Sequence, residues 1–174
     1  MSLRFKVPLI LQIAVFLIPM NIYVIGDWLG AGIQWVFFRY INAQDKSSII
    51  LLNREIGLIV SGTLTGKSAF ASILWTAGVI LLVAATILIV YGTIETDPDV
   101  IKKGAFVNLG GAVLFLFSVF LQYGIFLNGP AGIAIPFGIP VIVVIAYWQY
   151  RVSCKIEIDP DIDGEKTGSE NLEA

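Results

Sequence analysis

The sequence predicts an all-α integral membrane protein, a four-helix transmembrane bundle with a small extracytoplasmic cap. Hydrophobic residues make up 57% of the 174 residues and charged residues only 14%, and the mean hydropathy is +0.85. In soluble domains, about a quarter of all residues are charged. Charges are absent from three long stretches, which run from Val7 to Gly26, from Ser68 to Ile94 and from Gly104 to Tyr150. These stretches are the candidate membrane segments.

The lengths of the uncharged stretches predict four spans. A bilayer core of ~30 Å needs about 20 apolar residues in a helix. The predicted spans are residues 8–25, 69–92, 105–127 and 132–150, and the turn residues 128–131 divide the last stretch. The first apolar run is longer than a secretory signal core and no small-residue cleavage site follows it, so we expect a retained helix. Residues 1–150 then form the membrane domain and residues 151–174 an acidic cytoplasmic tail.

The distribution of Lys and Arg predicts the orientation in the cell membrane. With four spans, both termini lie on one side, together with seven cationic residues: Arg4, Lys6, Lys102, Lys103, Arg151, Lys155 and Lys166. The opposite side carries four: Arg39, Lys46, Arg54 and Lys67. Cytoplasmic loops are enriched in such residues. We therefore expect cytoplasmic termini and an outer loop formed by residues 26–68.

The outer loop is expected to form the cap. Residues 28–41 are nearly all apolar but too few to cross a bilayer, which predicts a helix lying in the outer interface. Trp28 and Trp35 would anchor it there, and Tyr147 and Trp148 would anchor the last span at the inner interface. Residues 47–52 and 56–60 are rich in β-branched side chains, so a short β-hairpin is possible and an amphipathic helix is the alternative. The cap either covers the bundle or docks a partner.

The segment SGTLTGKS (61–68) resembles a nucleotide-binding P-loop only superficially. The P-loop needs Gly, four residues and then Gly-Lys-Ser or Gly-Lys-Thr, but Ser61 occupies the first Gly position. A P-loop also belongs to a sizeable α/β domain, which residues 26–68 are too few to form. We expect no nucleotide binding, and a turn at Gly62 and Gly66. The formal charge of −2 and the lack of a basic cluster give no reason to expect nucleic acid.

Polar residues in the spans are few, and they form one pattern. Asn108, Gly111, Phe115, Ser118 and Gln122 follow a 3-4-3-4 spacing on one face of the third span. Such a seam of small and amide residues favours helix packing, because amides hydrogen-bond across helices in a membrane. The alternative is that Asn108, Ser118 and Gln122 line a polar pathway. The spans hold no ionisable residue and the chain has no His, which leaves no evident catalytic group.

The acidic tail contains DPDIDGEKTGSE (159–170), which resembles the calcium loop of the EF-hand family. The resemblance implies that Asp159, Asp161, Asp163 and Glu170 offer carboxylates and Glu165 its carbonyl to calcium. The competing interpretation is a disordered acidic tail. No other cofactor is expected.

These features predict a non-enzymatic membrane protein, a scaffold or accessory subunit that docks another membrane protein or a second copy of itself. The alternative is a small oligomeric channel or transporter built around the third span. A lipid-handling enzyme would need carboxylates near the outer interface, such as Asp27 and Glu55.

Overall fold

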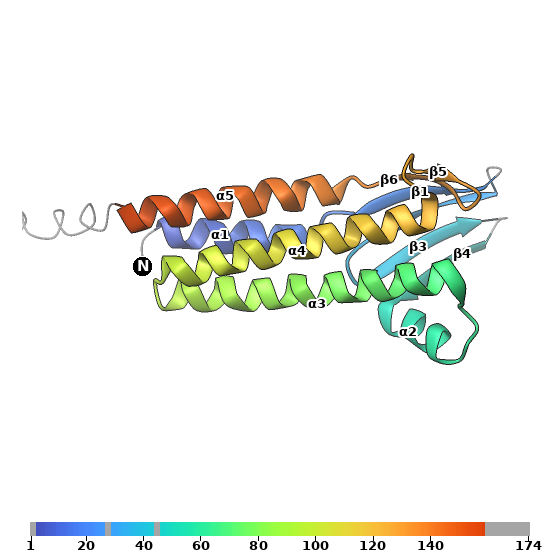
Figure 1. Cartoon of the computed structure of the whole chain (residues 1–174), viewed down its shortest axis with the longest axis horizontal. Coiled ribbons are helices and arrows are strands. Elements are labelled where there is room, and N and C mark those ends of the chain that lie inside the picture. Colours follow the sequence, from blue (N-terminus) through green and yellow to red (C-terminus); the bar gives the residue numbers. More distant parts are fainter. Residues whose placement is uncertain (1–2, 27–28, 44–45, 159–174) are drawn as a thin grey trace, which may run out of the picture.

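The computed structural model describes residues 3–26, 29–43 and 46–158, and it is elongated, with a sheet at one end (Figure 1). Four helices run along its length: α1 (Leu3–Val15), α3 (Gly66–Ile94), α4 (Pro98–Tyr123) and α5 (Gly138–Ile158). The sheet end holds the short helix α2 (Leu52–Val60) and the strands β1 (Asn21–Ile25), β2 (Gly30–Gln34), β3 (Phe38–Ala43), β4 (Lys46–Leu51), β5 (Asn128–Gly129) and β6 (Gly132–Ile135). The first described residues, the α3–α4 turn and the end of α5 lie at the opposite end.

The prediction of an all-α, four-span bundle is wrong. The strands form one antiparallel sheet in the order β4-β3-β2-β1-β6-β5. Among the described residues, only α3 and α4 are both long enough and apolar enough to cross a membrane. Helix α1 has 13 residues, which corresponds to about 20 Å at 1.5 Å per residue, less than the thickness of a bilayer core.

The first and last predicted spans are each part helix and part strand. Residues 8–25 leave the helix after Val15 and become strand β1 at Asn21, and residues 132–150 begin with strand β6. These two strands pair with each other, with Ile22 opposite Ile135 and Val24 opposite Ile133. A short run of apolar, β-branched residues suits a buried strand as well as a helix. Hydropathy therefore indicated neither the type of element nor the exposure of its outer side, where Ile22, Ile133 and Ile135 are exposed.

The outer loop contributes strands where we expected an interfacial helix. The described part of this segment, residues 29–41, contains β2, a tight turn and most of β3, and Trp35 stacks on Phe38 across that turn with ring centroids 4.9 Å apart. Residues 47–52 and 56–60 do not form the possible hairpin with each other, and the alternative, a helix, holds only for the second run. The first run is β4, which pairs with β3, and the second lies in α2.

Helices α3 and α4 form a hairpin whose ends are encoded locally. Asp97 caps α4 by accepting hydrogen bonds from the backbone N–H groups of Asp99 and Val100, at 2.9 and 3.4 Å. Pro98 occupies the first turn, where its missing N–H costs nothing. Gly78 and Gly111 allow the two backbones to approach, since a Cβ on Gly111 would lie 3.3 Å from the Gly78 carbonyl oxygen. The predicted span 69–92 lies within α3, and 105–127 overlaps α4.

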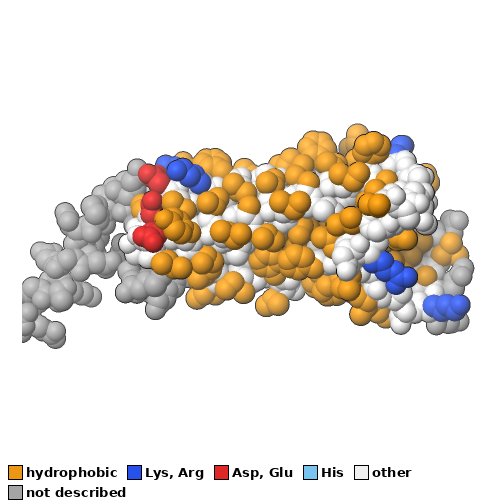
Figure 2. All heavy atoms as spheres, turned by 90° about the horizontal axis from the view of Figure 1, so that it is seen from below, with side chains coloured by type: hydrophobic (Ala, Val, Ile, Leu, Met, Phe, Trp, Pro, Cys, Tyr) orange, Lys and Arg blue, Asp and Glu red, His pale blue; other side chains and the backbone are white. Residues whose placement is uncertain are grey.

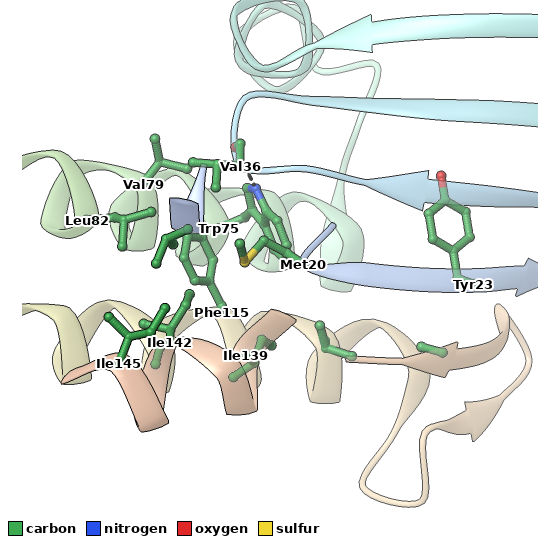
Figure 3. Close-up of a cluster of buried hydrophobic side chains, with 14 of the residues drawn as sticks. Met20, Tyr23, Val36, Trp75, Val79, Leu82, Phe115, Ile139, Ile142 and Ile145 are labelled. Carbon is green, nitrogen blue, oxygen red and sulfur yellow. Dashed lines mark hydrogen bonds between the residues drawn. The ribbon is translucent and has the colours of Figure 1, made fainter. Parts of the chain in front are cut away.

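The apolar core lies where the sheet meets the helices (Figure 3). Trp75 of α3 and Phe115 of α4 pack with ring centroids 4.6 Å apart. Trp75 Nε1 also donates a hydrogen bond of 3.2 Å to the Val36 carbonyl oxygen, between β2 and β3. Met20, from the segment that precedes β1, and Ile142, from α5, complete the packing. The sheet is thereby fixed to the bundle.

Candidate functional site

Three buried amide side chains meet in the middle of the helix bundle. They are Gln12 of α1, Asn108 of α4 and Gln149 of α5, and each has 0% of its surface exposed. Gln12 Nε2 donates to Asn108 Oδ1 at 3.1 Å and to Thr86 Oγ1 of α3 at 2.9 Å. Asn108 Nδ2 donates to Gln12 Oε1 at 2.5 Å and to Gln149 Oε1 at 3.0 Å. We call Gln12, Thr86, Asn108 and Gln149 the amide cluster.

Every amide N–H in the cluster has an acceptor. Gln149 Nε2 donates its two hydrogens to Gln12 Oε1 at 3.1 Å and to the Pro8 carbonyl oxygen at 3.2 Å. Buried polar groups are costly unless they are hydrogen-bonded. The cluster meets this requirement, and it connects all four long helices to one another.

A buried ion pair joins the sheet to the helices. Arg39 of β3 contacts Glu55 of α2, and their side chains are only 16% and 5% exposed. Ser72 of α3 donates a hydrogen bond of 3.1 Å to the same carboxylate oxygen, Glu55 Oε1. The pair and the serine thus connect three elements. Removing one member of a buried ion pair leaves an uncompensated charge, so the contact holds α2 in place against both neighbours.

Tyr23 of β1 faces this ion pair from the inner side of the sheet. Its ring lies 6.0 Å from that of Tyr123 of α4. Burial raises the pKa of the Tyr23 hydroxyl above its ordinary value, and the Arg39 charge opposes part of the rise. Within the described part of the chain, Tyr23 Oη, Arg39 Nε and the Asn21 amide have no hydrogen-bond partner. The phenol is therefore held neutral beside the ion pair.

The outer face of the sheet is mostly apolar and largely exposed. Directly paired residues of an antiparallel sheet point to the same side. The register places eight Ile, Leu, Phe and Tyr residues on the side opposite Tyr23 and Arg39, together with Val24 and Ala31 and with the polar Asn42, Ser47 and Asn128. We call the first eight the outer sheet face: Ile22, Ile33, Phe38, Tyr40, Ile49, Leu51, Ile133 and Ile135. Ile49 and Ile135 are 60% and 59% exposed. An antiparallel sheet with a solvated face normally carries polar residues there.

The predicted seam on the third span lies on α4. Asn108, Gly111, Phe115 and Ser118 are buried, and Gln122 is half-buried and lies outside the amide cluster. Ser118 Oγ donates a hydrogen bond of 2.7 Å to the Ala71 carbonyl oxygen of α3. The structure thus brings four of the five seam residues into contact regions between helices.

The other predicted residues are spread over the molecule. Trp35 is half-buried at the β2–β3 turn, and Tyr147 and Trp148 are exposed on α5. Trp28, Asp27 and the calcium-loop residues Asp159, Asp161, Asp163, Glu165 and Glu170 lie outside the described residues. Among the residues that are described, no three His, Cys, Asp or Glu side chains come close enough together to hold a metal ion.

The P-loop-like segment connects two helices. It follows α2 rather than a strand, and Lys67 is exposed in the first turn of α3. Gly62 and Gly66 have φ values of 72° and 62°, a left-handed conformation that glycine adopts without strain. The segment is therefore a turn that joins α2 to α3.

Sequence reasoning missed most members of both polar groups. Gln12 and Gln149 are each the only Gln in their predicted spans, residues 8–25 and 132–150, which was the available indication of a buried polar contact. Arg39 and Glu55 gave no such indication, because their contact depends on a strand and a helix that were not predicted. No model of a known protein family matches the chain, and no curated protein is significantly similar to it.

Proposed function

We propose that this protein is a non-enzymatic, multi-pass membrane protein, a scaffold or accessory subunit that docks a partner through the outer sheet face. The helix hairpin α3–α4 crosses the bilayer. The sheet and α2 project from the outer side, and they present the docking surface to a protein of the same membrane.

The exposed apolar surface of the helices supports the membrane placement. In their most apolar windows, only 33% of α3 and 44% of α4 is buried inside the protein. Ile80 and Ile87 of α3 are each 63% exposed, and Phe117 of α4 is 55% exposed. Figure 2 shows hydrophobic side chains along the middle of one face of the bundle, with charged side chains only toward its two ends. A bilayer would cover such a belt.

The distribution of charge supports an orientation with the sheet outside. The end opposite the sheet carries Lys102 and Lys103 at the start of α4, and Arg151 and Lys155 in the last part of α5. Of the four cations at the sheet end, Arg39 is neutralised by Glu55, which leaves Lys46, Arg54 and Lys67. Under the positive-inside rule, this distribution favours an orientation with the end opposite the sheet in the cytoplasm.

The amide cluster is the observation that carries the scaffold proposal. A polar pathway needs amides that face water and exchange partners, whereas these amides are fully buried and all their N–H donors are used within the cluster. Such a network favours fixed helix packing over conduction. The channel or transporter alternative would need a different pathway, between copies of the chain.

The outer sheet face supports docking. Contiguous exposed apolar patches mark interaction sites in proteins, and none of the eight residues of this face is charged. The edge strand β4, which carries Ile49 and Leu51 of this face, has one unpaired side. An uncovered edge is a further template for association. A partner of the same membrane would reach both the face and the edge.

The experiment tests the face with matched lysine substitutions. Ile49→Lys places a charge on the outer sheet face, whereas Ser48→Lys places it on the exposed neighbour that points to the other side of β4. The wild type and both variants are extracted from native membranes in mild detergent, and the protein mass in each particle is measured by light scattering. We expect the wild type and Ser48→Lys in particles larger than the 19.0 kDa chain and Ile49→Lys as the single chain.

Three results would contradict or redirect the proposal. If all three proteins are single chains, or if both variants dissociate equally, the outer sheet face is not the docking surface. Co-expression of two differently tagged copies shows whether the partner is a second copy. A solute flux in vesicles that contain only the purified wild type would favour the channel alternative.

A further inference from the structure

A groove of about 360 Å³ lies between α4 and α5, in the half of the bundle away from the sheet. Its lining is Ala105, Phe106 and Leu109 from α4, and Val143, Ala146, Tyr147 and Tyr150 from α5. The alanines are 3% exposed and leave room between the helices, while Phe106 and Tyr147 are 58% and 61% exposed and stand as walls. The groove is thus apolar along its length.

Two cations border the end of the groove that faces the termini. Lys102 Nζ lies 5.8 Å from the Tyr150 ring centroid, and the Arg151 guanidinium carbon lies 5.9 Å from that of Tyr147. Both rings line the groove. Lys102 is one helical turn before Phe106 on α4, so the cations and the apolar groove form one continuous surface.

We propose that this groove binds an anionic phospholipid of the surrounding bilayer. One acyl chain lies between α4 and α5, against Ala105 and Ala146. The phosphate group lies at the end of the groove, where Lys102 and Arg151 supply positive charge. An amphiphile with a negative head matches both features, whereas a neutral lipid matches only the apolar one. The proposal goes beyond the docking function but rests on the membrane placement proposed above.

Native mass spectrometry of the detergent-purified protein tests the site, with phosphatidylglycerol and phosphatidylcholine of identical acyl chains as probes. We expect the wild type to retain phosphatidylglycerol preferentially. Lys102→Gln with Arg151→Gln should weaken phosphatidylglycerol binding about 25-fold, because each cation near a membrane surface contributes roughly a factor of five. The matched control pair, Lys103→Gln with Lys155→Gln, removes two exposed cations that do not border the groove and should change binding little.

A second pair of variants tests the groove itself. Val143→Trp enlarges a 40%-exposed lining residue and should reduce retention of both lipids. Val144→Trp enlarges its 64%-exposed neighbour outside the lining and should not. If Val143→Trp does not fold, the charge variants alone decide.

Several results would overturn the proposal. Equal retention of the two lipids by the wild type would do so, as would equal losses in the two charge variants. Membrane fractionation is done first on the same cells. A protein that is absent from the membrane fraction overturns the membrane placement and the lipid site together, whereas a membrane protein without phosphatidylglycerol selectivity overturns the lipid site alone.

Discussion

Replacing Gln12 by leucine should destabilise the protein more than any other single change in the amide cluster. Gln12 makes four hydrogen bonds: it donates to Thr86 and Asn108 and accepts from Asn108 and Gln149. Without it, Asn108 Oδ1 loses its donor, and Asn108 Nδ2 and Gln149 Nε2 each keep one N–H without an acceptor.

The size of the effect follows from these four bonds. Interhelical hydrogen bonds in membranes average about 0.6 kcal/mol each, which gives a lower estimate near 2 kcal/mol. Each buried polar group left without a hydrogen-bond partner costs about 1 kcal/mol or more, which raises the estimate toward roughly 4 kcal/mol. Thr86→Val removes one of the four bonds, so it should cost less than half as much as Gln12→Leu.

Unfolding in mixed micelles with increasing denaturing detergent, followed by circular dichroism, measures these differences. The decisive comparison is the triple variant Gln12→Leu, Asn108→Leu and Gln149→Leu. Replacing the three amide partners together by apolar groups removes the buried polar atoms that a single change leaves without a hydrogen bond. The triple variant should therefore lose much less stability than the sum of the losses in the three single variants. Additive losses, or a Gln12→Leu protein as stable as the wild type, would refute the closed network.

Three further predictions concern the sheet. Glu55→Gln should cost about 3 kcal/mol or more in free energy of unfolding because it leaves Arg39 buried without its counter-charge; a loss below 1 kcal/mol in the same unfolding assay would argue against the ion pair. Tyr23 has a raised pKa in the folded state, so the wild type should lose stability as pH rises above about 10, where unfolded tyrosine ionises, and Tyr23→Phe should lose less; identical slopes would contradict this. A Cβ on Gly32 would lie 2.3 Å from the Tyr23 ring, whereas one on Gly57 would meet nothing within 4 Å. Gly32→Ala should therefore lower the melting temperature and Gly57→Ala should preserve or raise it, and the reverse order would be inconsistent with the packing of Tyr23.

The sequence predicted the helix hairpin well because its determinants are local. An uncharged run fills most of α3, whereas α4 begins ahead of the predicted span 105–127, because Asp97 and Pro98 provide a cap and a first-turn proline that hydropathy does not indicate. The seam on α4 was visible for the same reason, since helical periodicity alone groups Asn108 with Ser118.

The sheet could not be predicted in the same way because its pairing is non-local. Strands β1 and β6 pair although most of the chain separates them. Strand β1 is apolar on both sides, so it lacks the alternation that distinguishes a half-exposed strand from part of a membrane helix. If Asn21–Ile25 continues the first helix, the apolar residues of β2 and β3 have no strand to pair with, and their hydropathy alone favours a membrane interface. The partners of Asn108 depend on the same pairing, because α1 leads into β1 and α5 follows β6, and these two helices carry Gln12 and Gln149.

The central claim, that the α3–α4 hairpin lies in a bilayer with the sheet outside, is tested most directly by labelling single cysteines in intact cells with a membrane-impermeant maleimide. In a Cys154→Ser background, Ile87→Cys lies at a position of α3 that is 63% exposed in the protein itself, so the chain's own fold does not shield it and a surrounding bilayer would. The account predicts that Lys46→Cys reacts from outside, that Lys103→Cys reacts only after permeabilisation, and that Ile87→Cys reacts only after denaturation. Reaction of Ile87→Cys in the folded protein as fast as that of an exposed surface cysteine would contradict the membrane placement.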